Sequence, residues 1–483
     1  MKRNITTVVL VAFLGGIIGR GFRYLLNVVI ARGLGAGALG TFAFGLVVLK
    51  LLSVFAKSGL DNAALKYVPR YRSEGDSQHI LGLTIVALGF PLVIGGLLIL
   101  VLTAARPFLT PVFDSRLLET LPLFALGIPI FSAMFIGMAV SRGYNESKYA
   151  VYTRDLGQSV VALGLVAIGA YLLVDFEAVV GGYIISLACG LGLVVWFLRK
   201  QGALRTDISP KFELKEWFTF AVPMAAIAVA NYLMSWTDVL MLGAFVTPEE
   251  LGWYQAAYQT SVLLLVVLQS SNSIFPSLAS GLYDDGKLQR LESIHGVITK
   301  WILYLTGLGG IYLFLYRSEV LRLFGETAPE AETALVILAA GQFITASVGS
   351  SGYLLTMSGY ERLNLLNTVV TVLLNVGLNY VLIQQYGIIG AGMATAVSLS
   401  VYNLGQLAEV YFILDIFPYN RSYWRGAIGF AVGVGLLLAG RLVPLFPLGK
   451  ALVAGFVALL GFGVTTWLLG FDQYDRLLIE SLD

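Results

Sequence analysis

The chain has 483 residues, of which 57% are hydrophobic and only 12% are charged. Soluble domains carry roughly 25% charged residues, so this composition cannot supply a water-facing shell, and it also excludes intrinsic disorder and disulfide-scaffold folds. The formal net charge of +2 is far from the basic balance of a nucleic-acid-binding protein. One cysteine and two histidines leave no internal disulfide and no His/Cys zinc site. With a mean hydropathy of +0.81, most of the surface is expected to face lipid.

Apolar segments long enough to cross a bilayer recur along the whole chain. A hydrocarbon core of about 30 Å needs roughly 20 apolar helical residues. The sequence predicts an all-α integral membrane protein with fourteen transmembrane helices. The predicted spans are 6–31, 38–57, 80–103, 119–140, 154–174, 178–198, 217–245, 251–276, 297–316, 333–357, 363–383, 388–413, 426–443 and 450–469. The first is expected to be a retained helix and not a cleaved signal peptide, because Arg20 and Arg23 interrupt it.

The distribution of lysine and arginine predicts the orientation of these spans. An even number of spans places both termini on one side of the membrane, and most of the 31 cations fall in the loops of that side. Cytoplasmic loops are enriched in these residues. We therefore expect a multi-pass protein of the cell (cytoplasmic) membrane with both termini cytoplasmic.

Three short motifs recur at a nearly constant spacing and predict an internal repeat. The pairs are Leu39-Gly40-Thr41-Phe42 with Leu251-Gly252-Trp253-Tyr254, Gly143-Tyr144 with Gly359-Tyr360, and Tyr171 to Gly181 with Tyr380 to Gly390. Six helices per repeat is an even number, so the repeats should share one orientation, with a central cavity between them as in transporters. The predicted domains are lobes 1–205 and 206–415, followed by two additional helices and a short cytoplasmic tail in 416–483.

Several of these segments are typical of one family. They are the stretch 32–42, which reads RGLG and then LGTF, the stretch 55–61, FAKSGLD, and the hairpin from Asn379-Tyr380 to Gly390-Ala391. Through them the chain resembles the polysaccharide-flippase branch of the multidrug/oligosaccharidyl-lipid/polysaccharide exporter superfamily. The resemblance implies two six-helix lobes, alternating access, and movement of a polyprenyl diphosphate-linked oligosaccharide from the cytoplasmic to the outer leaflet. We expect a transporter and not an enzyme, surrounded by membrane lipids, with no nucleic-acid partner, functioning as a monomer.

Charged residues inside the first two spans mark a candidate substrate site. Gly16, Arg20, Arg23 and Asn27 follow one another at spacings of 4, 3 and 4, which places all four on one helical face. Lys50 is expected at the depth of Arg20, because each lies 15 residues from the turn at Gly35. A cation in mid-membrane costs roughly 2.5 to 3.5 kcal/mol, so this face should line a wet cavity or be paired.

Three cations without an acid on these two helices favour an anionic ligand. Guanidinium groups match phosphate oxygens in a bidentate manner, and a lysine adds a point charge. The hypothesis is that Arg20, Arg23 and Lys50 hold the diphosphate, with Asn27 on the same face, while Trp236 stacks on a sugar ring. The alternatives are that the arginines cap helix carbonyls or extend to the interface, and that Trp236 packs between helices. Asp155, at the start of the fifth span, is expected to be interfacial.

A second polar stripe, Asn231, Ser235 and Asp238, lies on the seventh predicted span. The lipid-linked peptidoglycan-precursor flippases of the same superfamily are similar here, which implies a sodium site. The residues that match are Asp238, Asn375, Asn379 and Thr395, with the Ala391 carbonyl as a further ligand. Asn379 stands where that pattern can carry a second acid, so coupling to sodium or to protons remains open. Alternatively, these amides only bond helices together. No cofactor other than a sodium ion is expected.

Two other functions compete with the flippase hypothesis. A membrane oligosaccharide ligase or polymerase needs a catalytic loop outside the membrane, and the longest outer loops, about 104–118 and 317–332, are short for one. A cation-coupled multidrug exporter of the same fold would typically have twelve helices, and three fixed positive charges would repel cationic drugs. No Walker A sequence is present, so direct ATP hydrolysis is unsupported.

Overall fold

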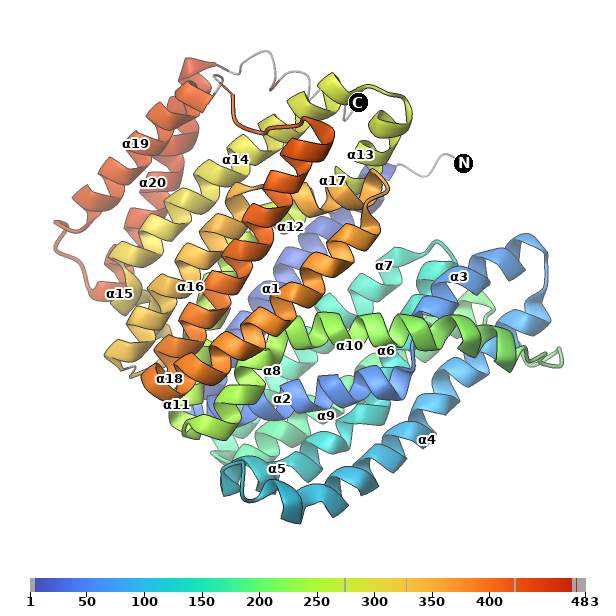
Figure 1. Ribbon diagram of the computed structural model, residues 1–483. Coiled ribbons are helices and arrows are strands. Elements are labelled where there is room, and N and C mark those ends of the chain that lie inside the picture. The colour runs from blue at the N-terminus through green and yellow to red at the C-terminus, as the bar shows by residue number, and fades with distance from the viewer. Residues whose placement is uncertain (1–4, 273–274, 327, 421–422, 471–474, 476–483) are drawn as a thin grey trace. The chain divides into compact units, whose positions relative to one another are not determined.

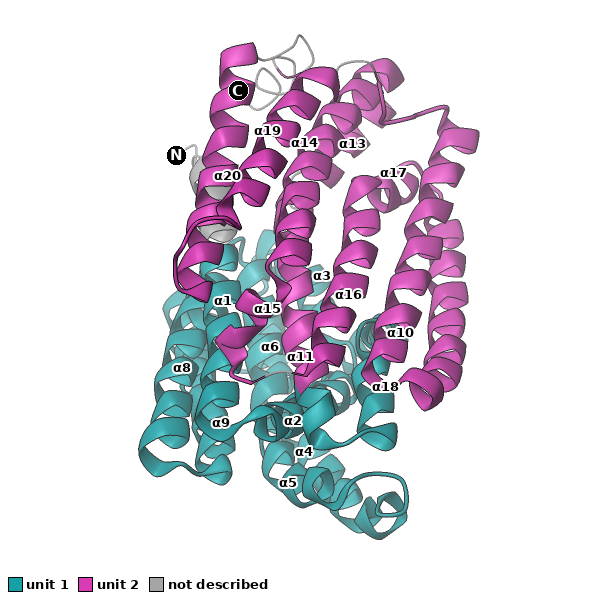
Figure 2. Cartoon of the chain, turned by 90° about the vertical axis from the view of Figure 1, so that its left-hand side faces the viewer, with its two compact units in different colours: residues 1–252 teal, residues 253–483 magenta. Residues whose placement is uncertain are grey.

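The computed structural model describes the chain except for residues 1–4, 273–274, 327, 421–422, 471–474 and 476–483. The described residues form helices joined by short turns (Figure 1). They divide into two compact units, unit 1 with residues 1–252 and unit 2 with residues 253–483 (Figure 2).

Unit 1 is built around α2 and α6. Helix α2 packs against α4, α6 and α10, and α6 also contacts α3 and α9, while α1 lies against α2 and α8. In its core the ring of Phe42 makes edge contacts with Phe124 at 5.6 Å and with Tyr183 at 5.4 Å. The helices are α1 (Ile5–Leu34), α2 (Ala36–Lys57), α3 (Leu60–Ser73), α4 (Ser77–Leu109), α5 (Ser115–Ala125), α6 (Gly127–Gly143), α7 (Ser147–Ala150), the π-helical η1 (Val151–Gln158), α8 (Ser159–Ala167), the π-helical η2 (Ile168–Leu173), α9 (Phe176–Gln201) and α10 (Leu214–Phe245).

Unit 2 is built around α14 and α16. Helix α14 packs against α16 and α19, α16 packs against α18, and α19 and α20 form a pair. Asp475 pairs with Lys300 of α14 at 2.8 Å, both side chains being buried, and also accepts a hydrogen bond from the Trp301 indole. The helices after α11 (Pro248–Val262), which starts in unit 1, are η3 (Leu263–Leu265), α12 (Val266–Ser271), α13 (Phe275–Asp284), α14 (Leu288–Leu315), α15 (Arg317–Leu321), η4 (Arg322–Phe324), α16 (Pro329–Ser347), α17 (Ser351–Met357), α18 (Glu361–Leu414), α19 (Trp424–Gly440) and α20 (Pro447–Leu469).

Aspartates fix the start of three of these helices. The carboxylates of Asp76, Asp114 and Asp175 accept hydrogen bonds from the backbone N–H groups of His79, Arg116 and Ala178, at the first turns of α4, α5 and α9. Such a cap satisfies a backbone donor that has no partner within the helix. Polar caps therefore mark where these long apolar helices begin.

Helix α18 is two helices joined at Gly387. This residue has φ 54° and ψ −131°, a backbone conformation that is accessible to glycine and costly for any side chain. The two parts, on either side of 387, correspond to the separate predicted spans 363–383 and 388–413. The turn predicted between Tyr380 and Gly390 is thus present, with the break at Gly387.

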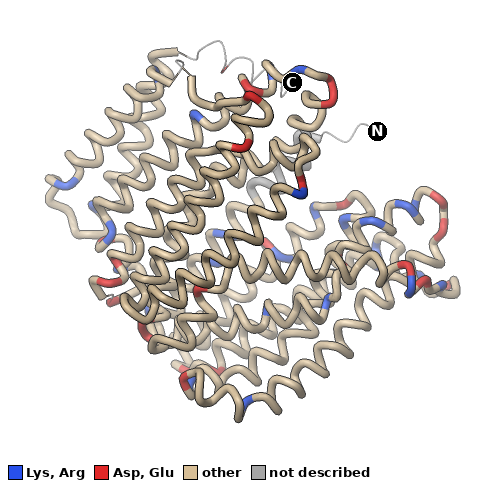
Figure 3. Tube along the Cα trace, viewed as in Figure 1, with Lys and Arg blue, Asp and Glu red and all other residues tan. Residues whose placement is uncertain are grey.

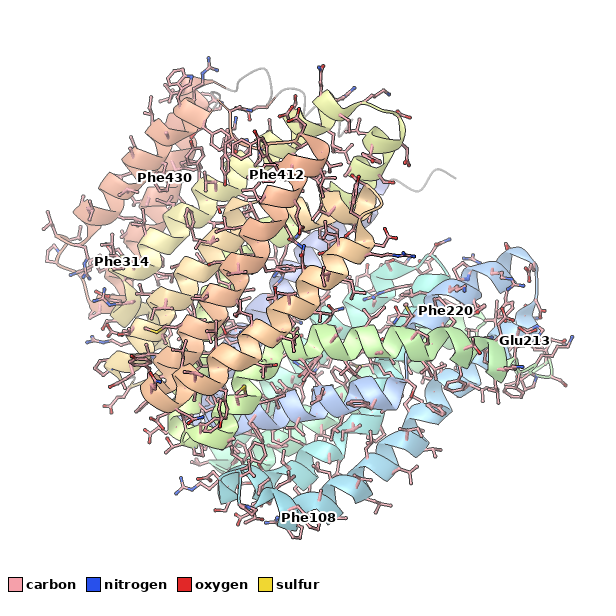
Figure 4. All side chains as sticks on the ribbon, viewed as in Figure 1. Phe108, Glu213, Phe220, Phe314, Phe412 and Phe430 are labelled. Carbon is pink, nitrogen blue, oxygen red and sulfur yellow. The ribbon has the colours of Figure 1, made fainter. Side chains whose placement is uncertain are left out.

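The helices expose apolar side chains over their length. Leu100 is 67% exposed, and Phe108, which projects from the end of α4, is 82% exposed (Figure 4). Along each unit the trace carries few charges, and these gather toward helix ends (Figure 3). In the described part of the chain, nine helices are long and apolar enough to cross a membrane, or up to eleven if each bent pair is one span. The chain is an all-helical, multi-pass membrane protein.

All fourteen predicted spans overlap helices of the structure. The count by length and composition is lower because it includes α18 once and omits α1 and the 17-residue α19. Two predicted spans are bent pairs, α5 with α6 at 49° and α16 with α17 at 42°. The region after the second predicted span forms the amphipathic helix α3, where a loop was predicted.

The repeated glycines Gly40 and Gly252 touch each other in unit 1. A Cβ atom on Gly40 would lie 2.7 Å from the Gly252 nitrogen and would overlap the carbonyl of Pro248. Reciprocally, a Cβ on Gly252 would lie 3.1 Å from the Gly40 nitrogen and would overlap the carbonyl of Ala36. A Cβ on either glycine would thus meet the other glycine and the residue four positions before that other glycine. The start of α2 and the start of α11 therefore cross with equivalent contacts.

Candidate functional site

Helix α1 crosses the π-helical segment η1 through two glycines. A Cβ atom on Gly15 would overlap Val151, and one on Gly19 would lie 2.7 Å from the Asp155 Cβ. Small residues four positions apart let helix backbones approach closely in a membrane. The next residue on this ridge, at the same spacing, is Arg23. The crossing therefore directs Arg23 toward Asp155.

Arg23 and Asp155 form an ion pair. The Arg23 Nη1 lies 3.2 Å from the Asp155 Oδ1, with 39% and 17% of the two side chains exposed. The neighbouring Arg20 donates a hydrogen bond from Nε to the Gly16 carbonyl, at 3.1 Å, and is also within electrostatic range of Arg23 and Asp155. Asn27 is buried and donates from its amide to the Arg23 carbonyl at 2.7 Å. Arg20 and Asn27 thus each bond to their own helix.

Lys50 joins this group from α2. Its ammonium lies 5.5 Å from the centre of the Trp236 ring and interacts electrostatically with Arg154 and Arg23. Trp236 in turn stacks on Tyr232 at 6.3 Å, so the tryptophan is engaged with a cation and with another ring of α10. Within unit 1 the structure therefore brings Lys50 near both Arg23 and Trp236.

Arg154 is a fourth cation near Arg23, and it was not among the predicted substrate-binding residues. It lies on η1 next to Asp155, with its guanidinium 5.2 Å from the centre of the Phe135 ring, and it interacts electrostatically with Arg23 and Asp155. We name Arg20, Arg23, Lys50, Arg154 and Asp155 the cationic cluster. As far as the described residues show, the cluster has four cations against one carboxylate, which leaves it a net positive charge. An anion of two or more charges complements such a site, since cations inside a membrane need a partner or water.

The signal for Arg154 and Asp155 was present in the sequence but weak. Both stand at the start of the predicted span 154–174, where charged residues usually mark the membrane interface. Only the π-helical turn and the glycine crossing show that Asp155 faces Arg23. The signal in the sequence was the adjacent charged pair Arg154-Asp155 at the start of a span, in a chain whose first span carries two arginines.

The predicted cation ligands belong to both units. In unit 1, Asp238 of α10 is buried and its Oδ1 accepts a hydrogen bond from the Val239 backbone at 2.8 Å. In unit 2, Asn379 donates to the Asn375 side chain and backbone oxygens at 3.0 and 2.9 Å, and the buried Asn379 Oδ1 has no hydrogen-bond partner among the described residues. Thr395 is partly buried on the second part of α18. The unpaired Asn379 oxygen is an acceptor of the kind that a hard cation or a water binds.

A polar network ties the segment before α10 to the rest of unit 1. Tyr71 donates to Glu213 at 2.7 Å and accepts from the Trp217 indole at 3.0 Å, while His79 lies between Asp76 and Glu213. The hydrogen bond from Tyr71 lowers the pKa of Glu213, and the hydrogen bond with His79 lowers the pKa of Asp76. Figure 4 shows Glu213 at the same end of α10 as Phe220. The network fixes the start of α10.

Comparison with known proteins identifies the family. The family model described as polysaccharide biosynthesis protein matches residues 5–281, more than half of the chain. The chain belongs to this family. A second model, described as MatE, matches residues 223–381. The predicted membership of the polysaccharide branch of the exporter superfamily is confirmed.

One relative and two solved structures extend this result. The chain is 26% identical to the probable low-salt glycan biosynthesis flippase Agl15 of Haloferax volcanii, over 89% of this chain and 87% of the relative. Its fold resembles the lipid II flippase MurJ in an inward closed conformation, with a TM-score of 0.72 at 14% identity, over 95% and 98% of the two chains. It also resembles an inward-facing multidrug resistance MATE transporter, with a TM-score of 0.71 at 15% identity, over 82% and 94%. At these identities the two structures establish the fold alone.

Proposed function

We propose that this protein is a flippase that moves a lipid-linked oligosaccharide, carried on a polyprenyl diphosphate, from the cytoplasmic to the outer leaflet by alternating access. The observation that carries this proposal is the cationic cluster, which places four cations beside one carboxylate in an apolar unit. Family membership and the name of the Haloferax relative, a probable glycan biosynthesis flippase, support it. Such a protein moves its substrate without making or breaking a covalent bond in it.

The cluster suits a diphosphate better than a single negative charge. Arg23 and Arg154 present planar guanidinium groups that donate two hydrogen bonds to neighbouring phosphate oxygens. Lys50, held against the Trp236 ring, adds a point charge from the adjacent helix. Arg20, whose Nε donates to the Gly16 carbonyl at 3.1 Å, adds a further positive charge to the cluster. In this mechanism the phosphates bind to the cluster and the glycan lies beside it, with Trp236 and Asn27 at its border.

The membrane topology that we propose has fourteen crossings with both termini in the cytoplasm. It counts α18 as two helices, because Gly387 breaks it, and adds α1 and α19. We further propose parallel six-helix lobes at 1–205 and 206–415, with 416–483 appended. Two features support the repeat, namely the equivalent contacts of Gly40 and Gly252 and the bend in both the fourth and the tenth predicted helix.

Transport is proposed to be coupled to a sodium or proton gradient through Asp238, Asn375, Asn379 and Thr395. These side chains would supply the one carboxylate and the neutral oxygens that suit a monovalent cation. Within unit 2, the buried Asn379 Oδ1 has no hydrogen-bond partner in the described part of the chain. A bound cation would neutralise the Asp238 carboxylate. Within unit 2, the Asn379 amide N–H group donates to the two Asn375 oxygens, which fixes the direction of the Asn379 Oδ1.

The test uses proteoliposomes that contain a polyprenyl diphosphate carrying a fluorescent disaccharide. Movement of the label between leaflets is followed by its reduction with external dithionite, under an imposed sodium or pH gradient. We expect Arg23→Gln to reduce the flipping rate by roughly tenfold or more, because it removes a charge-assisted contact worth about 1.5–3 kcal/mol. Arg106→Gln is the matched control, because Arg106 is an exposed arginine on α4 of the same unit.

Three results would count against parts of the proposal. Flipping that is equally fast in Arg23→Gln and in the wild type would remove the cluster from substrate binding. Transport of ethidium, with no movement of the diphosphate lipid, would favour the multidrug exporter. Rates that respond to neither gradient, or that survive Asp238→Asn unchanged under both, would remove the coupling site.

A further inference from the structure

The carboxylate of Asp155 occupies a contact that the cluster would otherwise offer to a ligand. It lies 3.2 Å from the Arg23 Nη1, and this is the one hydrogen bond between the two side chains in the described part of the chain. The pair is therefore monodentate, with 39% of the Arg23 side chain exposed. A single partly exposed contact is weak compared with the two parallel bonds that a guanidinium group can form with a phosphate.

The backbone holds Asp155 at this place. Gly19 of α1 leaves no room for a side chain against the Asp155 Cβ, so the acid is fixed at the crossing between α1 and η1. The residue lies in the eight-residue π-helical segment Val151–Gln158. Wider turns of this kind occur often at functional sites in helices, where they re-aim side chains. Here the turn presents both Arg154 and Asp155 to the same group of cations.

The charges around Arg23 are of both signs. Arg20, Lys50 and Arg154 surround it electrostatically with positive charge, and Asp155 is the carboxylate that contacts it. Without Asp155, the cluster would have four cations and no acid while empty. With Asp155 and a bound diphosphate, two anions would compete for the same guanidinium group.

We propose that Asp155 is a positioning residue that takes the place of substrate phosphate on Arg23, so that the diphosphate displaces it on binding and its return assists release. This inference rests on the proposed function and adds a specific residue to it. A carboxylate and a phosphate oxygen accept the same N–H donors, but the diphosphate carries more charge and reaches several cations at once. Asp155 therefore weakens substrate binding, and it speeds turnover by refilling the contact on Arg23.

The experiment measures binding of farnesyl diphosphate to the full-length protein in nanodiscs by isothermal titration calorimetry, with farnesol as the uncharged control. Asp155→Asn should bind farnesyl diphosphate about two- to fivefold more tightly, the range for losing one partly exposed competing ion pair. Asp155→Ser, which also removes the charge with a smaller side chain, should behave alike if the asparagine variant folds poorly. Glu177→Gln, which removes an exposed acid at the first turn of α9, should leave the affinity unchanged.

A double variant separates this role from a structural one. In the Arg23→Gln background the Asp155→Asn change should no longer tighten binding, because the guanidinium group for which they compete is gone. In the flipping assay Asp155→Asn should slow release and lower the turnover rate despite its tighter binding. This split between affinity and rate is not expected from a residue that only holds α1 against η1.

The outcomes distinguish the inference from the function beneath it. If farnesyl diphosphate binds in an Arg23-dependent manner but Asp155→Asn and Asp155→Ser bind it equally or more weakly, the role of Asp155 is wrong and the flippase proposal stands. The role is equally wrong if the tightening persists in the Arg23→Gln background. If no variant and no wild-type protein binds farnesyl diphosphate above farnesol, both proposals fail together.

Discussion

Replacing Gly40 with alanine tests the helix crossing between α2 and α11 within residues 1–252. The added Cβ would lie 2.7 Å from the Gly252 nitrogen, at least 0.7 Å short of the 3.4 Å at which ordinary contact begins, and it would also overlap the Pro248 carbonyl. Both neighbours are backbone atoms, so no side chain can rotate away. Forcing an extra carbon into such a contact costs about 1–3 kcal/mol, which exceeds the roughly 0.5–1 kcal/mol that alanine gains over glycine in a helix.

The assay is the thermal unfolding midpoint of the purified full-length protein in detergent, followed by tryptophan fluorescence. Gly40→Ala should lower this midpoint, whereas Gly37→Ala, three residues earlier on α2 with nothing within 4 Å of its Cβ, should not. Gly252→Ala should act like Gly40→Ala, and the double variant should cost less than the sum, because the first substitution already opens the crossing. Equal midpoints for Gly37→Ala and Gly40→Ala would refute the reasoning.

Two further predictions concern charged contacts. Glu213 and Asp76 have pKa values below their usual ranges, so the stability that they add is present above about pH 4.5 and is lost as the pH falls through the lowered values. Glu213→Gln should therefore lower the thermal unfolding midpoint at pH 7, by an amount corresponding to less than about 1 kcal/mol because the side chain is partly exposed. The same variant should show a weaker fall of the midpoint as the pH is lowered. An unchanged acid dependence in this variant would contradict the assignment. Asp475→Asn should destabilise the protein by about 3–5 kcal/mol, because it removes the Asp475 carboxylate from the buried Lys300 ammonium. The double change Lys300→Met with Asp475→Leu should recover most of this loss. A midpoint equal to that of the wild type in Asp475→Asn would show that this pair contributes nothing.

Apolar runs were sufficient to locate the helices, and less so to define their shape. The break at Gly387 was expected as a turn between two spans, since the sequence Gln384-Gln385-Tyr386-Gly387 interrupts the apolar pattern there. The bends within α5–α6 and α16–α17 were not predicted, because apolar composition continues through them. Helix α3 was missed because its amphipathic pattern contains Pro69 and is too polar for a membrane span. Hydropathy reports solvent preference and not backbone direction.

Helical spacing also identified most of the cationic cluster. The 4-3-4 pattern placed Arg20, Arg23 and Asn27 on one face, and the distance from Gly35 brought Lys50 to their side. Arg154 and Asp155 could not be placed in the same way, because an ordinary helical period does not apply in a π-helical segment. Helical periodicity relates residues only within one helix, so it could not relate Asp238 of α10 to the asparagines of α18, which are distant in the sequence.

The π-helical turn at Val151–Gln158 has an evolutionary consequence. Its hydrogen bonds span one residue more than those of an α-helix, so losing one codon in this stretch would convert it to ordinary helix and rotate the preceding residues by about 100° relative to those that follow. Arg154 and Asp155 would then change places with their neighbours at the α1 crossing. A single deletion would thus change which charged side chain faces Arg23, while every other helix keeps its sequence.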